Sequence, residues 1–164
     1  MEIKSSLIQD GQVIPFVYRD IDSLDELRGE KINSTRAYCF CGDKLVVVYE
    51  EKKGTWGPPG GAIEIGETVE EAVVREVLEE SNMRVLKQAV FGYLEAFEPV
   101  HALETRSVCI VEPAGPFVGD PDGDVTEVTL IDPKDITQYF DWGENGARQL
   151  ERALSLKEKI SQRR

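Results

Sequence analysis

The stretch from Trp56 to Met83 constrains the fold of this chain more than any other. It opens with Trp-Gly-Pro-Pro-Gly-Gly, in which two prolines fix φ and remove backbone donors, while the glycines permit conformations closed to other residues. This composition excludes a regular helix or a central strand and predicts a tight loop that can approach a ligand closely. Thr68, with Glu71 three residues later, forms a capping box, which predicts a helix over 69–81.

Three glutamates of the predicted helix, Glu76, Glu79 and Glu80, are spaced i, i+3, i+4 and share a side that overlaps its apolar face. Carboxylates at a buried face repel one another and lose hydration, so the arrangement is costly unless cations lie between them. Glutamate-rich helices are common on solvated surfaces, but the glycine loop at a fixed distance favours a metal site. Oxygen ligands without a nearby cysteine or histidine favour Mg²⁺ or Mn²⁺ over zinc.

Gly61 is followed by five residues and Glu67, and seven further residues lead to Arg-Glu-Val-Leu-Glu-Glu at 75–80. This pattern closely resembles the Nudix box of the Nudix hydrolases, G-x5-E-x7-R-E-U-x-E-E-x-G-U, where U is a bulky aliphatic residue. Asn82 stands where the family has glycine. Asparagine is the next best residue in the left-handed conformation that ends a helix, so Asn82 is expected at positive φ. The resemblance implies an α/β fold, the Nudix α/β/α sandwich with a mixed β-sheet.

The resemblance also implies an enzyme, a Nudix pyrophosphohydrolase that uses Mg²⁺ (or Mn²⁺). Its reaction would be hydrolysis of the pyrophosphate bond in a nucleoside diphosphate linked to another moiety. The positions that match the family's metal ligands are Glu76, Glu79, Glu80 and the carbonyl of Gly60. The positions that match catalytic or supporting residues are Glu79, Arg75 and Glu67.

Residues outside the box are less diagnostic. Lys53 leads into the glycine loop and is close enough along the chain to help hold phosphates, although a solvated lysine at a strand end explains it equally well. Asp124 and Glu127 are candidates for a general base outside the box, but a solvated surface role is the simpler interpretation of each. Pro99 stands sixteen residues beyond Met83, nearly where ADP-ribose hydrolases of the family carry a proline. It is also explained as a turn after a strand.

Two alternatives stay open beside a hydrolase of ADP-ribose or another nucleotide sugar. One is a house-cleaning nucleoside triphosphate pyrophosphohydrolase, and the other is a non-catalytic Nudix-like module for nucleotide sensing or protein binding. The complete set of box glutamates favours an enzyme. The net charge of −12 argues against nucleic acid as a partner, whereas bound divalent cations permit a small phosphorylated substrate.

The length of 164 residues fits one domain over 1–164, with an N-terminal extension at 1–34 and a C-terminal helix at 145–164. No apolar run is long enough to cross a bilayer and the first residues lack the pattern of a signal peptide, so no membrane partner and a cytoplasmic location are expected. The N-terminal extension is long enough to pair or swap between two subunits, which leaves a homodimer open.

The remaining sequence predicts a sheet of several strands. One or two short strands are expected within 3–18, and Gly42-Asp43 is a turn signal between two strands. A loop is expected at 99–104 and a short turn of helix at 133–136. The strands are predicted at 35–41, 44–50, 85–96, 106–112 and 125–131, and the amphipathic closing helix at 145–159.

Overall fold

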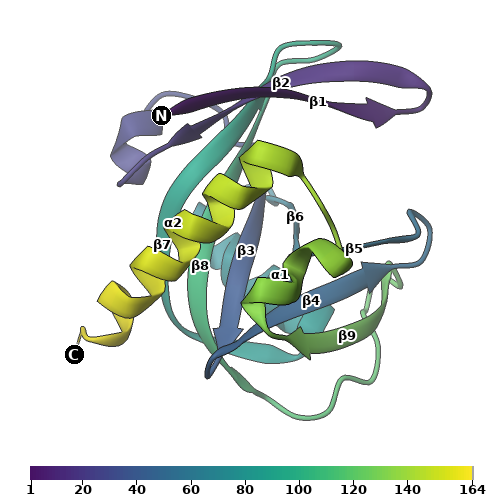
Figure 1. Ribbon diagram of the computed structural model, residues 1–164, viewed down its shortest axis with the longest axis vertical. Helices are drawn as coiled ribbons and strands as arrows, with labels where there is room; N and C mark the ends of the chain where they lie inside the picture. Colours follow the sequence, from purple (N-terminus) through teal and green to yellow (C-terminus); the bar gives the residue numbers. More distant parts are fainter. Residues whose placement is uncertain (164) are drawn as a thin grey trace.

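A mixed sheet lies between two helices in the computed structural model, which describes residues 1–163. Helix α1, Val69–Ser81, covers one face of the sheet, and helix α2, Gly143–Ser161, lies across the other (Figure 1). The strands are β1 Glu2–Gln9, β2 Gln12–Asp20, β3 Ser34–Cys41, β4 Lys44–Glu50, β5 Thr55–Gly57, β6 Gly60–Ala62, β7 Met83–Ala96, β8 Ala102–Pro113 and β9 Val125–Ile131. Two 3-10 helices, η1 Leu24–Leu27 and η2 Pro133–Gln138, complete the chain. The predicted α/β/α sandwich is confirmed.

The strand order is β1-β2-β7-β8-β3-β4-β5, with β6 on β3 and β9 on β4. The β3–β8 pair is parallel and the other pairs are antiparallel, so the sheet is mixed as expected. Strands β3 and β4 pair only next to their turn, at Phe40↔Leu45 and Cys41↔Lys44. Farther along, β3 pairs with β6 and β4 pairs with β5. The sheet therefore splits between β3 and β4. The segment 56–61, called the Gly-Pro loop from here on, lies in this split, where the carbonyl of Pro59 accepts from the N–H of Ala37 on β3.

Side-chain alternation on β3 assigns one core to each face of the sheet. Ala37 and Cys39 lie in a buried cluster with residues of α1. Tyr38 and Phe40 point the other way, into the larger cluster that α2 covers. Alternate residues of β3 therefore pack toward α1 on one face of the sheet and toward α2 on the other.

The predicted box helix is confirmed at both ends. The side chain of Thr68 accepts from the backbone of Glu71, the side chain of Glu71 accepts from Thr68, and the helix runs over Val69–Ser81. Asn82 has φ 53°, in the left-handed region, and donates its backbone N–H to Leu78. The 44–50 strand and its hairpin with β3 are also confirmed.

Several boundaries differ from the sequence prediction. The 99–104 loop was predicted too long, because β7 and β8 stay paired as far as Ala96↔Ala102 and the turn needs only the residues between them. The N-terminal strands are longer than expected, since β1 and β2 pair along their whole length. Helix α2 begins at Gly143 and not at residue 145, and Arg164 lies outside the described part of the chain. Between residues 1 and 163, no helix is both long and apolar enough to span a membrane.

Candidate functional site

The glycines of the loop bring its backbone against the box helix. The N–H of Gly60 donates to Oε1 of Glu80 at 2.7 Å. A Cβ on Gly60 would overlap the backbone of Thr35 and Arg36, and a Cβ on Gly61 would lie 2.6 Å from Oε1 of Glu76. At Gly60 the neighbour is backbone, so only glycine fits there, whereas a side chain at Gly61 would push the Glu76 carboxylate out of its place. The sequence thus places loop backbone and helix carboxylates in direct contact.

Arg75 hydrogen-bonds to three carboxylates, and a fourth, that of Glu64, lies 3.8 Å from its Nη1. Its Nε and Nη2 donate to the two oxygens of Glu67, at 2.7 and 2.9 Å. Its Nη1 donates to Glu76 at 2.9 Å and to Glu79 at 3.3 Å. The hydrogen bonds to Glu67 raise the pKa of Arg75 and lower that of Glu67, so both stay charged. The pair that was predicted to support the site therefore holds Glu76 and Glu79 in place.

The three glutamates differ in their environments. Glu76 and Glu80 are only 8% and 6% exposed, whereas the side chain of Glu79 is 26% exposed. Burial raises the pKa of Glu80 to about 8, although the N–H of Gly60 opposes the shift. Burial also raises the pKa of Glu76 and of Glu79, and Arg75 opposes both shifts. Carboxylates in this state bind protons readily or require cations.

The donor atoms at the box helix are all oxygens, which is the chemistry that a hard divalent cation takes. In the described residues the spacing of a three-carboxylate metal site is found for Glu79 with Asp120 and Asp122, and not for Glu76, Glu79 and Glu80 together. The helix presents carboxylate oxygens of Glu76, Glu79 and Glu80 beside the backbone of Gly60. Arg75 hydrogen-bonds to Glu76 and Glu79, whereas Glu80 accepts from the N–H of Gly60. The guanidinium of Arg75 is also paired with Glu67, so its single positive charge does not balance the negative charges of the three box glutamates. Oxygen-only ligands are those that Mg²⁺ and Mn²⁺ prefer.

The structure adds two aspartates that the sequence prediction missed. Oxygens of Glu79, Asp120 and Asp122 lie within 4.8 Å of one another, in a spacing suited to a metal ion. Asp120 also accepts from the backbone N–H of Asp122 and of Val125, both at 3.1 Å, which fixes the loop between β8 and β9. The run Asp-Pro-Asp-Gly-Asp at 120–124 was the only signal, and nothing in it shows which carboxylate turns inward.

The candidates outside the box lie at different places. Asp124 is exposed and 4.0 Å from Nζ of Lys52, and Glu127 is exposed on β9 opposite Tyr49. Lys53 is 63% exposed, and its Nζ lies 3.2 Å from Glu50. Pro99 is exposed in the turn between β7 and β8. None of these four belongs to the carboxylate group around Glu79 in the described residues.

A half-buried ion-pair network next to the split between β3 and β4 was also missing from the sequence prediction. Arg36 donates to the carbonyl of Pro58 at 3.0 Å and lies 3.6 Å from both Glu50 and Glu104. Burial would raise the pKa of Glu104, but the charges of Arg106 and Arg36 outweigh it and hold the pKa at about 2. Through Arg36 the network links β3, β4 and β8 to the Gly-Pro loop.

Comparisons with known proteins agree with this geometry. Residues 33–153 match the family model of the NUDIX domain. The chain is 31% identical over 96 residues to a MutT-like protein of Streptomyces ambofaciens, covering 58% of this chain and 59% of that protein. It is 34% identical over 50 residues to the uncharacterized Nudix hydrolase YvcI of Bacillus subtilis, covering 30% of this chain and 32% of that protein. The matched part is thus less than two thirds of either relative.

Solved structures give the same picture for the fold. The pyrophosphohydrolase BsRppH of Bacillus subtilis superposes with a TM-score of 0.71, over 94% of this chain and 97% of that one, at 18% identity. Identity this low supports a shared fold and nothing finer. The family model covers most of the chain, including the box loop, helix α1 and the loop with Asp120 and Asp122. The chain therefore belongs to the Nudix hydrolase family.

Proposed function

We propose that this protein is a divalent-metal-dependent pyrophosphohydrolase that cleaves a nucleoside diphosphate linked to another moiety. The observation that carries the proposal is the pair of buried glutamates, Glu76 and Glu80, beside the backbone of Gly60. Their burial costs stability unless a cation or protons neutralise them. A module that only senses nucleotides or binds proteins would have no need for this cost.

Each residue of the site has a proposed part. Glu76, Glu79, Glu80 and the carbonyl of Gly60 hold Mg²⁺ or Mn²⁺, which would neutralise phosphate oxygens and lower the pKa of a bound water. Arg75, fixed by Glu67, keeps Glu79 and Glu76 oriented toward that site. The tight glycine loop keeps the backbone close to the phosphates.

The general base is proposed among carboxylates that reach Glu79. Asp120 and Asp122 satisfy this condition through the 4.8 Å grouping, and Glu79 itself is the third candidate. Asp124 lies on the same loop but pairs with Lys52, and Glu127 lies on β9. The geometry therefore favours the two nearer aspartates over the two candidates chosen from sequence.

For the substrate we propose a nucleotide sugar of the ADP-ribose kind. Its support is the position of Pro99, nearly where ADP-ribose hydrolases of the family carry a proline. A structure described as an ADP-ribose pyrophosphatase from Streptococcus suis shares only the fold, at 20% identity, and adds no support for the substrate. A nucleoside triphosphate is the second candidate, because the MutT-like relative matches at 31% identity. Lys53, which reaches Glu50 at the edge of the split, is the proposed contact for the distal phosphate.

The test is a panel of ADP-ribose, a dinucleoside polyphosphate and an oxidised nucleoside triphosphate, each assayed with Mg²⁺, with Mn²⁺ and with chelator. We expect metal-dependent release of a nucleoside monophosphate, with the highest kcat/KM on ADP-ribose. A triphosphate preferred by more than about tenfold, or about 1.4 kcal/mol in transition-state stabilisation, would overturn the substrate. Binding of all three without turnover under any metal would overturn the enzyme and favour the non-catalytic module.

A further inference from the structure

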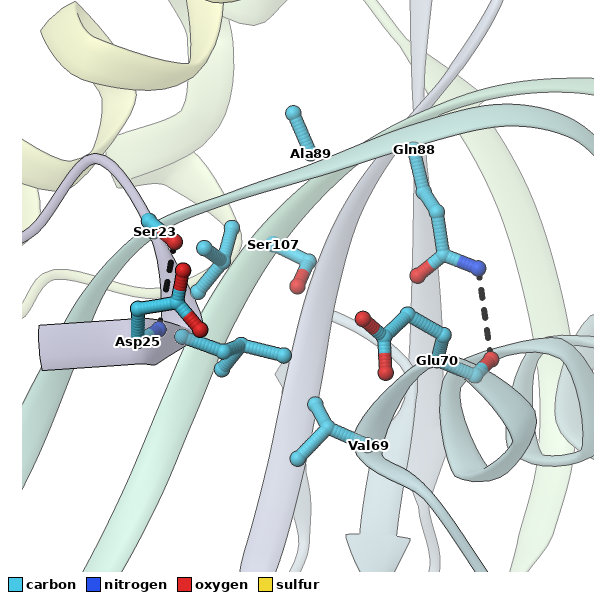
Figure 2. Close-up of a pocket in the computed structure, with 9 residues that line it drawn as sticks. Ser23, Asp25, Val69, Glu70, Gln88, Ala89 and Ser107 are labelled. Atoms are coloured by element: carbon cyan, nitrogen blue, oxygen red, sulfur yellow. Dashed lines mark hydrogen bonds between the residues drawn. The ribbon is translucent and has the colours of Figure 1, made fainter. Parts of the chain in front are cut away.

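A cavity of about 280 Å³ lies on the α1 face of the sheet, where η1, the first turn of α1, β7 and β8 meet (Figure 2). None of the box glutamates that hold the proposed metal lines it. Its walls come from Asp25 of the η1 segment, Val69 and Glu70 of α1, Gln88 of β7 and Ser107 of β8. The proposed pyrophosphohydrolase reaction uses none of these residues.

Ser107 forms the floor of the cavity. The residue is 2% exposed, and among the side-chain hydrogen bonds of residues 1–163 none involves its hydroxyl, which faces the cavity. Figure 2 shows this hydroxyl turned into the space between the carboxylates of Asp25 and Glu70. In the described residues the fully buried side-chain polar atoms without a partner belong to Tyr18 and Arg152, so the Ser107 hydroxyl is reached from the cavity and is open to a hydrogen bond from a group that enters there.

The walls offer acceptors and no cationic side chain. Gln88 donates its Nε2 to the backbone carbonyl of Glu70 at 3.2 Å, which leaves its side-chain oxygen as the free end. The carboxylate of Glu70 forms no ion pair in the described chain. Asp25 pairs with Arg28 at 3.0 Å, but these side chains are 78% and 80% exposed, so that pair is weak. The polar part of the cavity therefore suits a cation.

The remaining lining residues are apolar apart from Ser23, whose hydroxyl accepts from the backbone N–H of Asp25, and they determine which cation fits. Leu24, Val69 and Val90 line the cavity and can cover a few methylene groups. Only two carboxylates are present, and in the described residues the three-ligand spacing of a metal site occurs at Glu79 and its two aspartates instead. We propose that this cavity binds a small molecule that carries a primary ammonium group on a short aliphatic chain.

The ammonium has three donors for the carboxylates and for Ser107, and the chain lies against Leu24 and Val69. A ligand there contacts the first turn of α1, next to the capping box of Thr68 and Glu71. Binding is therefore expected to stabilise the start of the helix that carries the proposed metal ligands. This effect is independent of whether the enzyme turns over.

The experiment titrates the full-length protein with 1,4-diaminobutane at constant ionic strength and follows backbone amide NMR shifts. We expect saturable shifts at Ser107, Gln88 and Glu70, with a Kd on the order of 1 mM for so small a ligand. Butane-1,4-diol and butanoate, which match its length without the positive charge, are expected not to bind. Shifts that rise linearly without saturation, or equal binding of the diol, would overturn the proposal.

Variants separate a built site from general attraction to an acidic protein. Glu70→Gln and Ser107→Ala are each expected to weaken diamine binding, by about tenfold for Glu70→Gln, because each removes a partner of the ammonium. Glu158→Gln makes the same charge change on the exposed surface of α2 and is expected to leave Kd unchanged. Equal weakening by Glu158→Gln would show that the diamine is attracted only by the overall negative charge, and would overturn the proposal. Unchanged diamine binding by Glu70→Gln, in a protein with an unchanged melting curve, would overturn it as well.

Discussion

The raised pKa of Glu80 predicts an unusual dependence of stability on pH in the metal-free protein. A carboxyl group with a pKa of about 8 in the folded state and 4.5 in the unfolded state binds more protons when folded between those pH values. Stability must then fall as pH rises from about 4.5 to about 8. At 1.36 kcal/mol per pH unit, this interval corresponds to a loss on the order of 3–5 kcal/mol.

The substitution Glu80→Gln isolates this effect. Glutamine has the shape of the protonated acid, and its side-chain oxygen can still accept from the N–H of Gly60, which is 2.7 Å away in the wild type. The variant is therefore expected to be as stable as the wild type near pH 5. Near pH 8 and without metal, it should be more stable by several kcal/mol, or roughly 10 °C in melting temperature for a chain of this size.

The assay is urea unfolding with chelator from pH 5 to 8, followed by the same series with saturating Mg²⁺. Wild type should lose stability across the series without metal, and the loss should shrink when Mg²⁺ is present, because a ligand that binds only the folded state stabilises it. Glu104, whose pKa is held at about 2, contributes stability that is lost only below about pH 4.5 and leaves this window undisturbed. A wild type that is equally stable at both ends, or a destabilised Glu80→Gln variant at pH 8, would refute the reasoning.

Three further predictions follow from the site. Glu79→Gln should lower kcat by about 10²-fold or more in steady-state assays, because it would remove a proposed metal ligand. Activity within a few-fold of wild type would contradict the proposed role of Glu79. Gly60→Ala should cost more than about 2 kcal/mol in urea unfolding, since its Cβ would overlap the backbone of Thr35, and an unchanged midpoint would contradict the close approach. Asn82→Gly should leave global stability within about 1 kcal/mol, yet increase hydrogen exchange over 114–124, because glycine suits positive φ but loses the side-chain bond to Pro116.

The parts of the fold that could be predicted are those set by local interactions between residues close in the sequence. Thr68 and Glu71 form a cap in almost any context, so both the start and the phase of α1 follow from sequence. The turn at Gly42-Asp43 behaves in the same way, with Gly42 at positive φ. Strand ends were less predictable, because β1 and β8 extend only as far as their partners allow.

Contacts between residues of the Nudix box could be predicted from the sequence, whereas contacts with residues far away in the sequence could not. Helical spacing brings Glu76 and Glu80 together, and Arg75 lies within one turn of Glu79, so these contacts need no tertiary information. Asp120 reaches Glu79 from a separate loop, and Arg36 reaches Glu50 across the split between two strands. Contacts of this kind depend on sheet order, which the sequence pattern does not encode.

The one departure from the family pattern has a structural consequence that joins both halves of the site. Asn82 keeps the left-handed conformation that glycine would adopt, and its side-chain Nδ2 also donates to the carbonyl of Pro116 at 2.9 Å. Its own backbone carbonyl accepts from Ala114 at 2.9 Å. Glycine could make only the second of these bonds. Asn82 thus ties the end of the box helix to the loop that brings Asp120 and Asp122 beside Glu79, so asparagine at this position adds a hydrogen bond between helix and loop that glycine cannot make.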